Sequence, residues 1–163
     1  MKKVSVVFVA LLTVAALASA QHGGGPGGDH GAGGPGGNAI VGSDGTIYIT
    51  NGTAITAVRS SGTVAWTATL SAAGHVTLSD GNLIAENATR ASDGTVTTTL
   101  TAISAASGAT AWTKTINGHA ELFPFSGGTY AIVVVPPATS GGTATRSLIG
   151  ISNSGGTLFT LAL

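Results

Sequence analysis

The residues of this chain that could carry acid–base chemistry are few and scattered. A carboxylate pair for glycoside hydrolysis would have to come from Glu86 and Glu121 or from aspartates in turns. Three aspartates stand in Ser-Asp-Gly steps, where the side chain of an aspartate bonds to the backbone of its own turn. The acidic residues of the chain are Asp29, Asp44, Asp80, Glu86, Asp93 and Glu121. We therefore predict structural carboxylates and no catalytic residues.

Nucleophilic and metal chemistry find equally little support. His75 and His119 each follow a glycine near the start of a repeat, and this repeated placement favours a structural position over a catalytic dyad. His22, Asp29 and His30 lie in a glycine-rich stretch that offers no rigid scaffold for a metal. The chain has no cysteine and no Gly-x-Ser-x-Gly motif, which excludes a disulfide framework and a cysteine nucleophile. We predict no metal site and no cofactor.

The composition limits the kinds of partner. The formal net charge is zero and 7% of the residues are charged, so no basic patch exists to bind nucleic acid or an anionic membrane. A surface made soluble mainly by Ser, Thr and Asn tolerates contact with itself. The predicted partner is therefore a protein, either another copy of this chain or a protein of the cell envelope.

The N-terminus has the pattern of a secretory signal peptide. Lys2 and Lys3 precede the apolar run Val4–Leu17, and Ala18-Ser19-Ala20 provides a small-x-small cleavage site before Gln21. The alternative is an uncleaved membrane anchor, but the run is shorter than the ~20 residues that span a bilayer. We predict a signal peptide over residues 1–20, a protein that is periplasmic or extracellular, and no membrane span after cleavage.

Beyond the signal peptide the texture changes twice. Residues 21–38 are rich in Gly and Pro, which predicts a flexible linker. From Ala39 onwards, short runs rich in Val, Ile and Thr alternate with Gly, Asn, Asp and Ser, as in β-strands separated by turns. Asn51-Gly52 is typical of a two-residue hairpin turn with both residues at positive φ. No window after the signal peptide shows a helical period, so the folded part is predicted to be all-β.

A motif that occurs three times indicates how these strands are organised. The copies are Ala57–Trp66, Ala102–Trp112 and the weaker Gly150–Phe159. Glycines 62, 108 and 155 lie 46 and 47 residues apart, and each precedes an aromatic residue by four positions. The structural repeat residues are Gly62, Trp66, Gly108, Trp112, Gly155 and Phe159. Such a period predicts a propeller or solenoid, here with units of four strands at about 39–72, 75–118 and 120–163.

The second and third repeats are longer than the first. Each is ten residues longer, and the extra residues fall at Ala91–Thr99 in one and at Pro136–Thr145 in the other, which are both rich in turn-forming residues. Insertions at the same point of two repeats are expected as loops on one face. We predict that these two long hairpins face a partner.

The pattern of Ala and a hydrophobic residue, three or four further residues, and then Gly-x-x-x-Trp, followed by a strand, resembles the repeat of PQQ-like (quinoprotein-type) β-propellers. The likeness covers residues 39–163 and is clearest at Ala57–Trp66 and Ala102–Trp112. It implies a blade architecture in which the Trp packs between neighbouring blades and the Gly makes the turn that lets it dock. The chain departs from the pattern at the position after the Ala-hydrophobic pair. The family usually has an acidic residue there, and this chain has Arg59, Ser104 and Ser152.

The catalytic members of that family are implied to hold a quinone cofactor inside a full ring, with acidic or amide ligands for calcium and, in some, a vicinal disulfide. Three units do not supply such a ring, and cysteine is absent. The resemblance therefore transfers the blade architecture and not the catalysis.

Three blades leave two terminal faces without a neighbour, since propellers typically have four or more blades. We expect one of three solutions: a truncated reading frame, closure of a ring by several chains, such as two chains with six blades, or packing as a sandwich or barrel. The predicted function is that of an exported, non-catalytic, propeller-like module that acts as a protein-binding or assembly scaffold. The alternatives are a fragment of a quinoprotein-like oxidoreductase and a surface structural or adhesive protein.

Overall fold

The computed structural model describes residues 39–72, 74–137 and 141–163. Within these ranges the regular structure consists of twelve β-strands, which confirms the prediction of an all-β fold. The described residues contain no helix that is long and apolar enough to cross a membrane. The predicted signal peptide and the predicted linker both lie outside the described residues and stay predictions.

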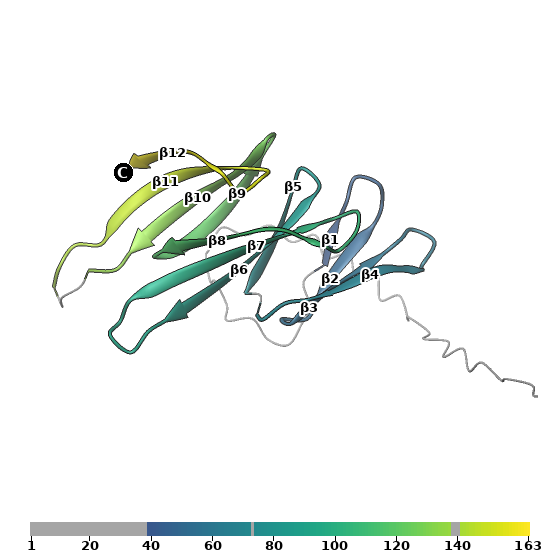
Figure 1. Cartoon of the computed structure of the whole chain (residues 1–163), viewed down its shortest axis with the longest axis horizontal. Helices are drawn as coiled ribbons and strands as arrows, with labels where there is room; N and C mark the ends of the chain where they lie inside the picture. Colours follow the sequence, from purple (N-terminus) through teal and green to yellow (C-terminus); the bar gives the residue numbers. More distant parts are fainter. Residues whose placement is uncertain (1–38, 73, 138–140) are drawn as a thin grey trace, which may run out of the picture. The chain divides into compact units, whose positions relative to one another are not determined.

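The strands form three four-stranded antiparallel sheets, in which each strand pairs with its neighbour in sequence (Figure 1). The first sheet consists of β1 (Ala39–Val41), β2 (Ile47–Thr50), β3 (Ala54–Val58) and β4 (Val64–Thr69). The second consists of β5 (His75–Ser79), β6 (Asn82–Arg90), β7 (Val96–Ser104) and β8 (Thr110–Asn117). The third consists of β9 (His119–Phe125), β10 (Gly128–Val135), β11 (Thr145–Ser152) and β12 (Thr157–Ala162). These sheets are consistent with propeller-like blades, and the described residues do not close a ring.

Corresponding strands are paired in the same register in all three sheets. The aromatic residue of each repeat lies opposite a small residue on the preceding strand: Trp66 opposite Ala57, Trp112 opposite Ala102, and Phe159 opposite Gly150. A register shift directly follows each of these small residues. Such a β-bulge bends its strand and re-aims a neighbouring side chain. The sequence repeat is therefore also a repeat of backbone geometry.

The turn before the last strand of each sheet depends on its glycine. Gly62, Gly108 and Gly155 have φ values of +82°, +74° and +83°, in the left-handed region that side chains with a Cβ rarely adopt. This explains why the glycine recurs in every repeat at a fixed distance from the aromatic residue.

The second sheet supplies side chains to two cores because successive residues of a strand point to opposite faces. Leu83 and Ile103 join a buried cluster with Tyr48 and Ile55 of the first sheet. The next residue along β6, Ile84, joins a second cluster with residues of the third sheet. The buried members of that second cluster are Ile84, Leu100, Ala102, Ile116, Ala120, Leu122, Ala131, Val133 and Ile151.

The insertion predicted at Ala91–Thr99 is wrong as a loop. β6 and β7 have nine residues each, and Arg90 pairs with Val96, so only residues 91–95 form the connection. The extra residues lengthen both strands because the run after Thr95 is β-branched and continues the ladder. In the third sheet, residues 136–144 do connect β10 to β11.

Candidate functional site

Two of the aspartates bond within their own turns, as the sequence predicts. Asp44 accepts hydrogen bonds from the backbone N–H of Thr46 at 3.0 Å and from its hydroxyl at 2.9 Å. Asp93 accepts the backbone N–H of Thr95 at 2.9 Å. These bonds hold the pKa of both carboxyls below the ordinary value, the backbone N–H contributing most. Both carboxylates therefore have a structural role.

Asp80 departs from this prediction because it does not cap its own turn. Its carboxylate accepts the backbone N–H of Gly127 and, at 3.3 Å, the side-chain amide of Asn153. Next to it, the hydroxyl of Ser79 donates to the carbonyl of Gly128 at 2.5 Å. Among the described residues Asp80 is the one non-glycine residue with a positive φ, 40°, a conformation that aspartate tolerates. Asp80 thus ties the second sheet to the third.

This contact predicts a pH dependence of stability. Hydrogen bonds from Gly127 and then Asn153 lower the pKa of Asp80 below its ordinary value of 3.8. The unfolded chain therefore takes up this proton at a higher pH than the folded chain, so the contribution is present above 3.8 and is lost as the pH falls through the lower folded-state pKa. We expect D80N to show a smaller loss of stability between about pH 6 and about pH 3 in urea unfolding. Asparagine tolerates the same φ and still accepts a hydrogen bond, so parallel curves for the two proteins would contradict this.

Glu86 and Glu121, the carboxylates considered for glycoside hydrolysis, lie on β6 and β9. Burial raises the pKa of Glu86, while the charge of His119 lowers it and that of Glu121 raises it. The Oε2 atom of Glu86 is buried and has no hydrogen-bond partner among the described residues. Neither carboxyl group lines the pocket described next.

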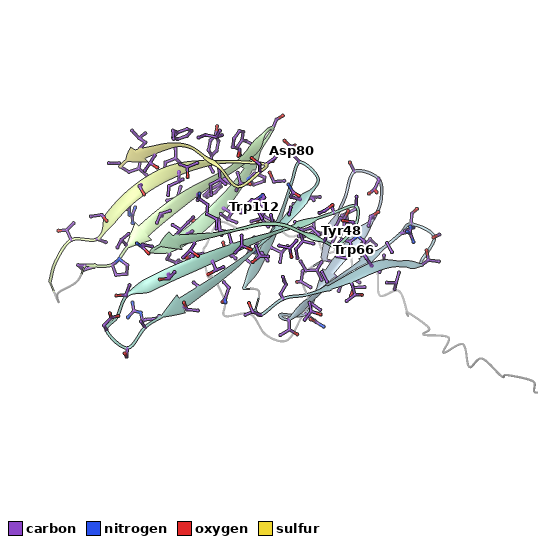
Figure 2. All side chains as sticks on the ribbon, in the orientation of Figure 1. Tyr48, Trp66, Asp80 and Trp112 are labelled. Atoms are coloured by element: carbon purple, nitrogen blue, oxygen red, sulfur yellow. The ribbon has the colours of Figure 1, made fainter. Side chains whose placement is uncertain are left out.

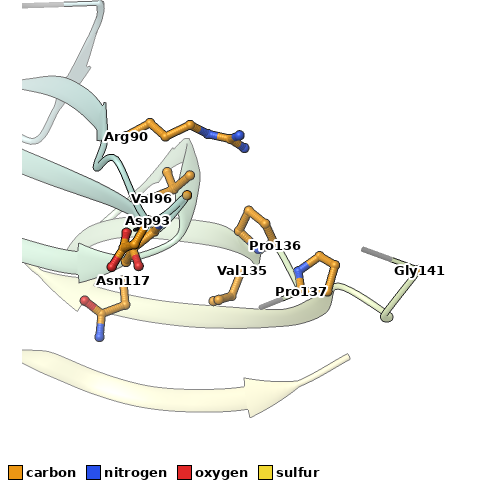
Figure 3. Close-up of a pocket in the computed structure, with 10 residues that line it drawn as sticks. Arg90, Asp93, Val96, Asn117, Val135, Pro136, Pro137 and Gly141 are labelled. Atoms are coloured by element: carbon orange, nitrogen blue, oxygen red, sulfur yellow. Dashed lines mark hydrogen bonds between the residues drawn. The ribbon is translucent and has the colours of Figure 1, made fainter. Parts of the chain in front are cut away.

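A pocket of about 700 Å³ lies between the far ends of the β6–β7 and β10–β11 hairpins (Figure 3). One side is formed by Arg90, Asp93 and Asn117, and the other by Pro136 and Pro137. The prolines offer flat apolar surfaces, and the guanidinium and amide groups offer hydrogen-bond donors. The pocket holds no cluster of titratable groups, and the described residues contain no group of three or more His, Asp or Glu that could hold a metal ion.

The strongest recurring feature is the joint between neighbouring sheets, in which an indole packs on the turn glycine of the next sheet. A Cβ added at Gly108 would lie 2.7 Å from ring atoms of Trp66. The Trp66 N–H donates to the carbonyl of Ala105 in the same turn at 3.0 Å, and Tyr48 packs against the indole at 5.9 Å between ring centroids (Figure 2). Indole packing with a satisfied N–H combines a large buried area with directional specificity.

The second joint repeats the first. A Cβ added at Gly155 would lie 2.9 Å from ring atoms of Trp112, whose N–H donates to the carbonyl of Asn153 at 2.8 Å. Figure 2 places Trp112 between β8 and the third sheet. The ammonium of Lys114 adds bonds to the Gly155 carbonyl at 3.2 Å and the Thr157 hydroxyl at 2.9 Å. Both tryptophans thus join one sheet to the next.

Phe159 occupies the same register position, but no fourth sheet of the described residues covers it. It belongs to a cross-strand row of paired residues, here named the Phe159 row: Phe123, Tyr130, Gly150 and Phe159. The equivalent rows of the other sheets are Ile40, Tyr48, Ala57 and Trp66, and Thr77, Ile84, Ala102 and Trp112. The side chains of those rows are buried or half-buried, whereas Phe123 is 41% and Phe159 42% exposed. The third sheet thus leaves exposed the face that, in each of the first two sheets, is covered by the next sheet.

Aromatic packing holds the Phe159 row in place. Tyr130 stacks on Phe125 with 4.1 Å between centroids and meets Phe159 at 6.1 Å in a tilted arrangement. On the same strand Leu161 is also exposed. Contiguous exposed apolar side chains of this kind mark interaction surfaces.

The sequence patterns found the repeat residues but missed Phe123 and Tyr130. The alternation of Phe123 and Phe125 along one strand was the signal available, because alternate residues share a face. What identifies them as one surface is the pairing of β9 with β10 and of β10 with β11.

No protein-family model matches the chain, and a search of curated proteins gave no significant match. The described residues form three four-stranded antiparallel sheets consistent with propeller-like blades.

Proposed function

We propose that this protein is an exported, non-catalytic, propeller-like repeat module that serves as a protein-binding or assembly scaffold in the cell envelope or outside the cell. The observation that carries the proposal is the exposed Phe159 row. Its equivalents in the other two sheets are the surfaces by which one sheet docks on another. An exposed copy of a docking surface is suited to receive another protein.

The distribution of the polar groups supports this proposal over a catalytic one. The carboxylates of Asp44, Asp80 and Asp93 are each occupied by backbone N–H groups. The likeness of the repeat to PQQ-like propellers adds support for a blade scaffold, through the two Trp–Gly joints.

Site-specific photocrosslinking tests whether a protein covers the exposed face. The full chain is expressed in an exporting bacterial host with benzoylphenylalanine in place of Leu161, next to the Phe159 row. We expect a discrete covalent adduct with a protein, because Leu161 lies on an apolar face that a partner would cover. The matched control carries the probe at Thr53, an exposed residue between β2 and β3 that lies outside the two hairpins predicted to face a partner. Absence of any adduct from position 161, or equal labelling from both positions, would refute a scaffold role for this face.

A further inference from the structure

The first sheet carries the other half of a joint, also exposed. Its outward cross-strand row, here named the Val41 row, consists of Val41, Ile47, Val58 and Val64. The equivalent row of the second sheet, which faces the first sheet, is Leu78, Leu83, Ile103 and Thr110. Leu83 and Ile103 there are fully buried, whereas Val41 is 66% and Val64 60% exposed. The first sheet thus offers an apolar face that in the other sheets a preceding sheet covers.

The turn glycine of the first sheet is likewise uncovered. Gly62 has nearly the same φ as Gly108 and Gly155, but a Cβ added at Gly62 would meet nothing within 4 Å. The other two glycines each carry an indole from the preceding sheet. Gly62 is therefore a docking turn without its aromatic ring, and Phe159 is an aromatic ring without its docking turn.

We propose that a second copy of this chain covers the Phe159 row with its own Val41 row, placing Phe159 on the partner's Gly62. The new contact continues the interface that the chain forms twice within itself, from the first sheet to the second and from the second to the third. This inference rests on the proposed scaffold function and names the partner of the same face.

The number of sheets points to a closed pair. A contact between two different faces of identical chains generates a ring when its rotation closes. Propellers typically have between about four and eight blades. Two copies supply six sheets, whereas one copy falls below this range and three copies exceed it. In a closed pair each Phe159 row meets one Val41 row, so two equivalent joints form and both apolar faces are buried.

The molar mass of the purified full-length protein tests this proposal, measured by sedimentation over a range of concentrations. We expect a species of twice the chain mass. F159S and G62V should each raise the dissociation constant on the order of 100-fold or more. F159S removes the aromatic ring from both joints of the pair, and G62V fills the glycine turn on which that ring packs. The controls are V135S, an exposed apolar residue outside the row, and G52V, a turn glycine with φ of +88° and open space around it. Both should retain the wild-type mass.

A mixture of the two interface variants tests the direction of docking. F159S keeps an intact Val41 face and G62V keeps an intact Phe159 row, so one joint can form between them. We expect a one-to-one heterodimer from the mixture under conditions in which each variant alone is a monomer. Three results would each overturn the inference. The wild type could stay a monomer at every concentration, or it could form species larger than the pair. Alternatively, F159S and G62V could each still form pairs as tightly as the wild type. An adduct between position 161 and a different protein would overturn it while leaving the scaffold function in place.

Discussion

Replacing Gly108 by alanine should lower the free energy of unfolding by about 2–5 kcal/mol. The left-handed backbone, with φ of +74°, costs an alanine roughly 1–2 kcal/mol relative to glycine. The new Cβ would also lie 2.7 Å from Cδ2 and Cε3 of Trp66, so the indole must shift within a packed joint, at a typical cost of about 1–3 kcal/mol. Urea unfolding followed by circular dichroism measures the change.

The matched control separates backbone strain from packing. Gly52 has a φ of +88° and open space around its Cα, so G52A should show the backbone cost of roughly 1–2 kcal/mol alone. The difference between the two losses of unfolding free energy then measures how much the packing of Trp66 on Gly108 contributes. Equal losses for G108A and G52A would show that Trp66 does not pack on this glycine.

Truncation of Trp112 to alanine is expected to cost about 2–4 kcal/mol. Removal of a large aromatic side chain from a fully packed site costs about 3–5 kcal/mol, and Trp112 is only half-buried. The substitution also removes the hydrogen bond to Asn153, which at 2.8 Å contributes roughly 1 kcal/mol. W112F keeps most of the ring contact, so its loss should approach that single hydrogen bond.

The equivalent position without a following sheet provides the comparison. F159A, measured at a dilution where copies do not associate, removes an aromatic ring from the same register but leaves no joint broken within the chain. We expect its loss to be less than half that of W112A. A loss as large as that of W112A would mean that the ring stabilises its own sheet, and that the joint is not what makes Trp112 important.

The hairpin at Asn51 shows how a correct pattern can give the wrong local geometry. The backbone N–H of Asn51 bonds to the carbonyl of Ala54, so the two-residue loop is Gly52-Thr53. Only Gly52 has a positive φ, whereas the sequence predicts it for both Asn51 and Gly52. Instead, the Asn51 side chain accepts the N–H of Ala54 at 2.9 Å. The turn was predictable, but the choice of loop residues depended on the register of β2 with β3.

Asp80 shows a similar limit. Ser79-Asp80-Gly81 has the same sequence as two turns in which the aspartate bonds to its own turn. The carboxylate of Asp80 instead accepts the backbone N–H of Gly127, which is forty-seven residues away. The Ser-Asp-Gly step is the same in all three, but Thr46 and Thr95 follow the two self-bonded aspartates, whereas Asn82 follows Asp80. The donor from Gly127 reaches Asp80 only when the third sheet docks on the second.

The sequence by itself predicted an all-β chain with a repeated unit, and the glycine and aromatic residue that recur in each repeat. These features depend on local preferences: alternation along a strand, glycine at a left-handed turn, and an aromatic residue at a fixed distance from it. Only the tertiary structure decided which faces are covered. Phe159 and Trp112 stand at the same place in their repeats, yet one is exposed and the other seated on Gly155, because burial depends on what lies across the sheet and not on the residue's neighbours in the chain.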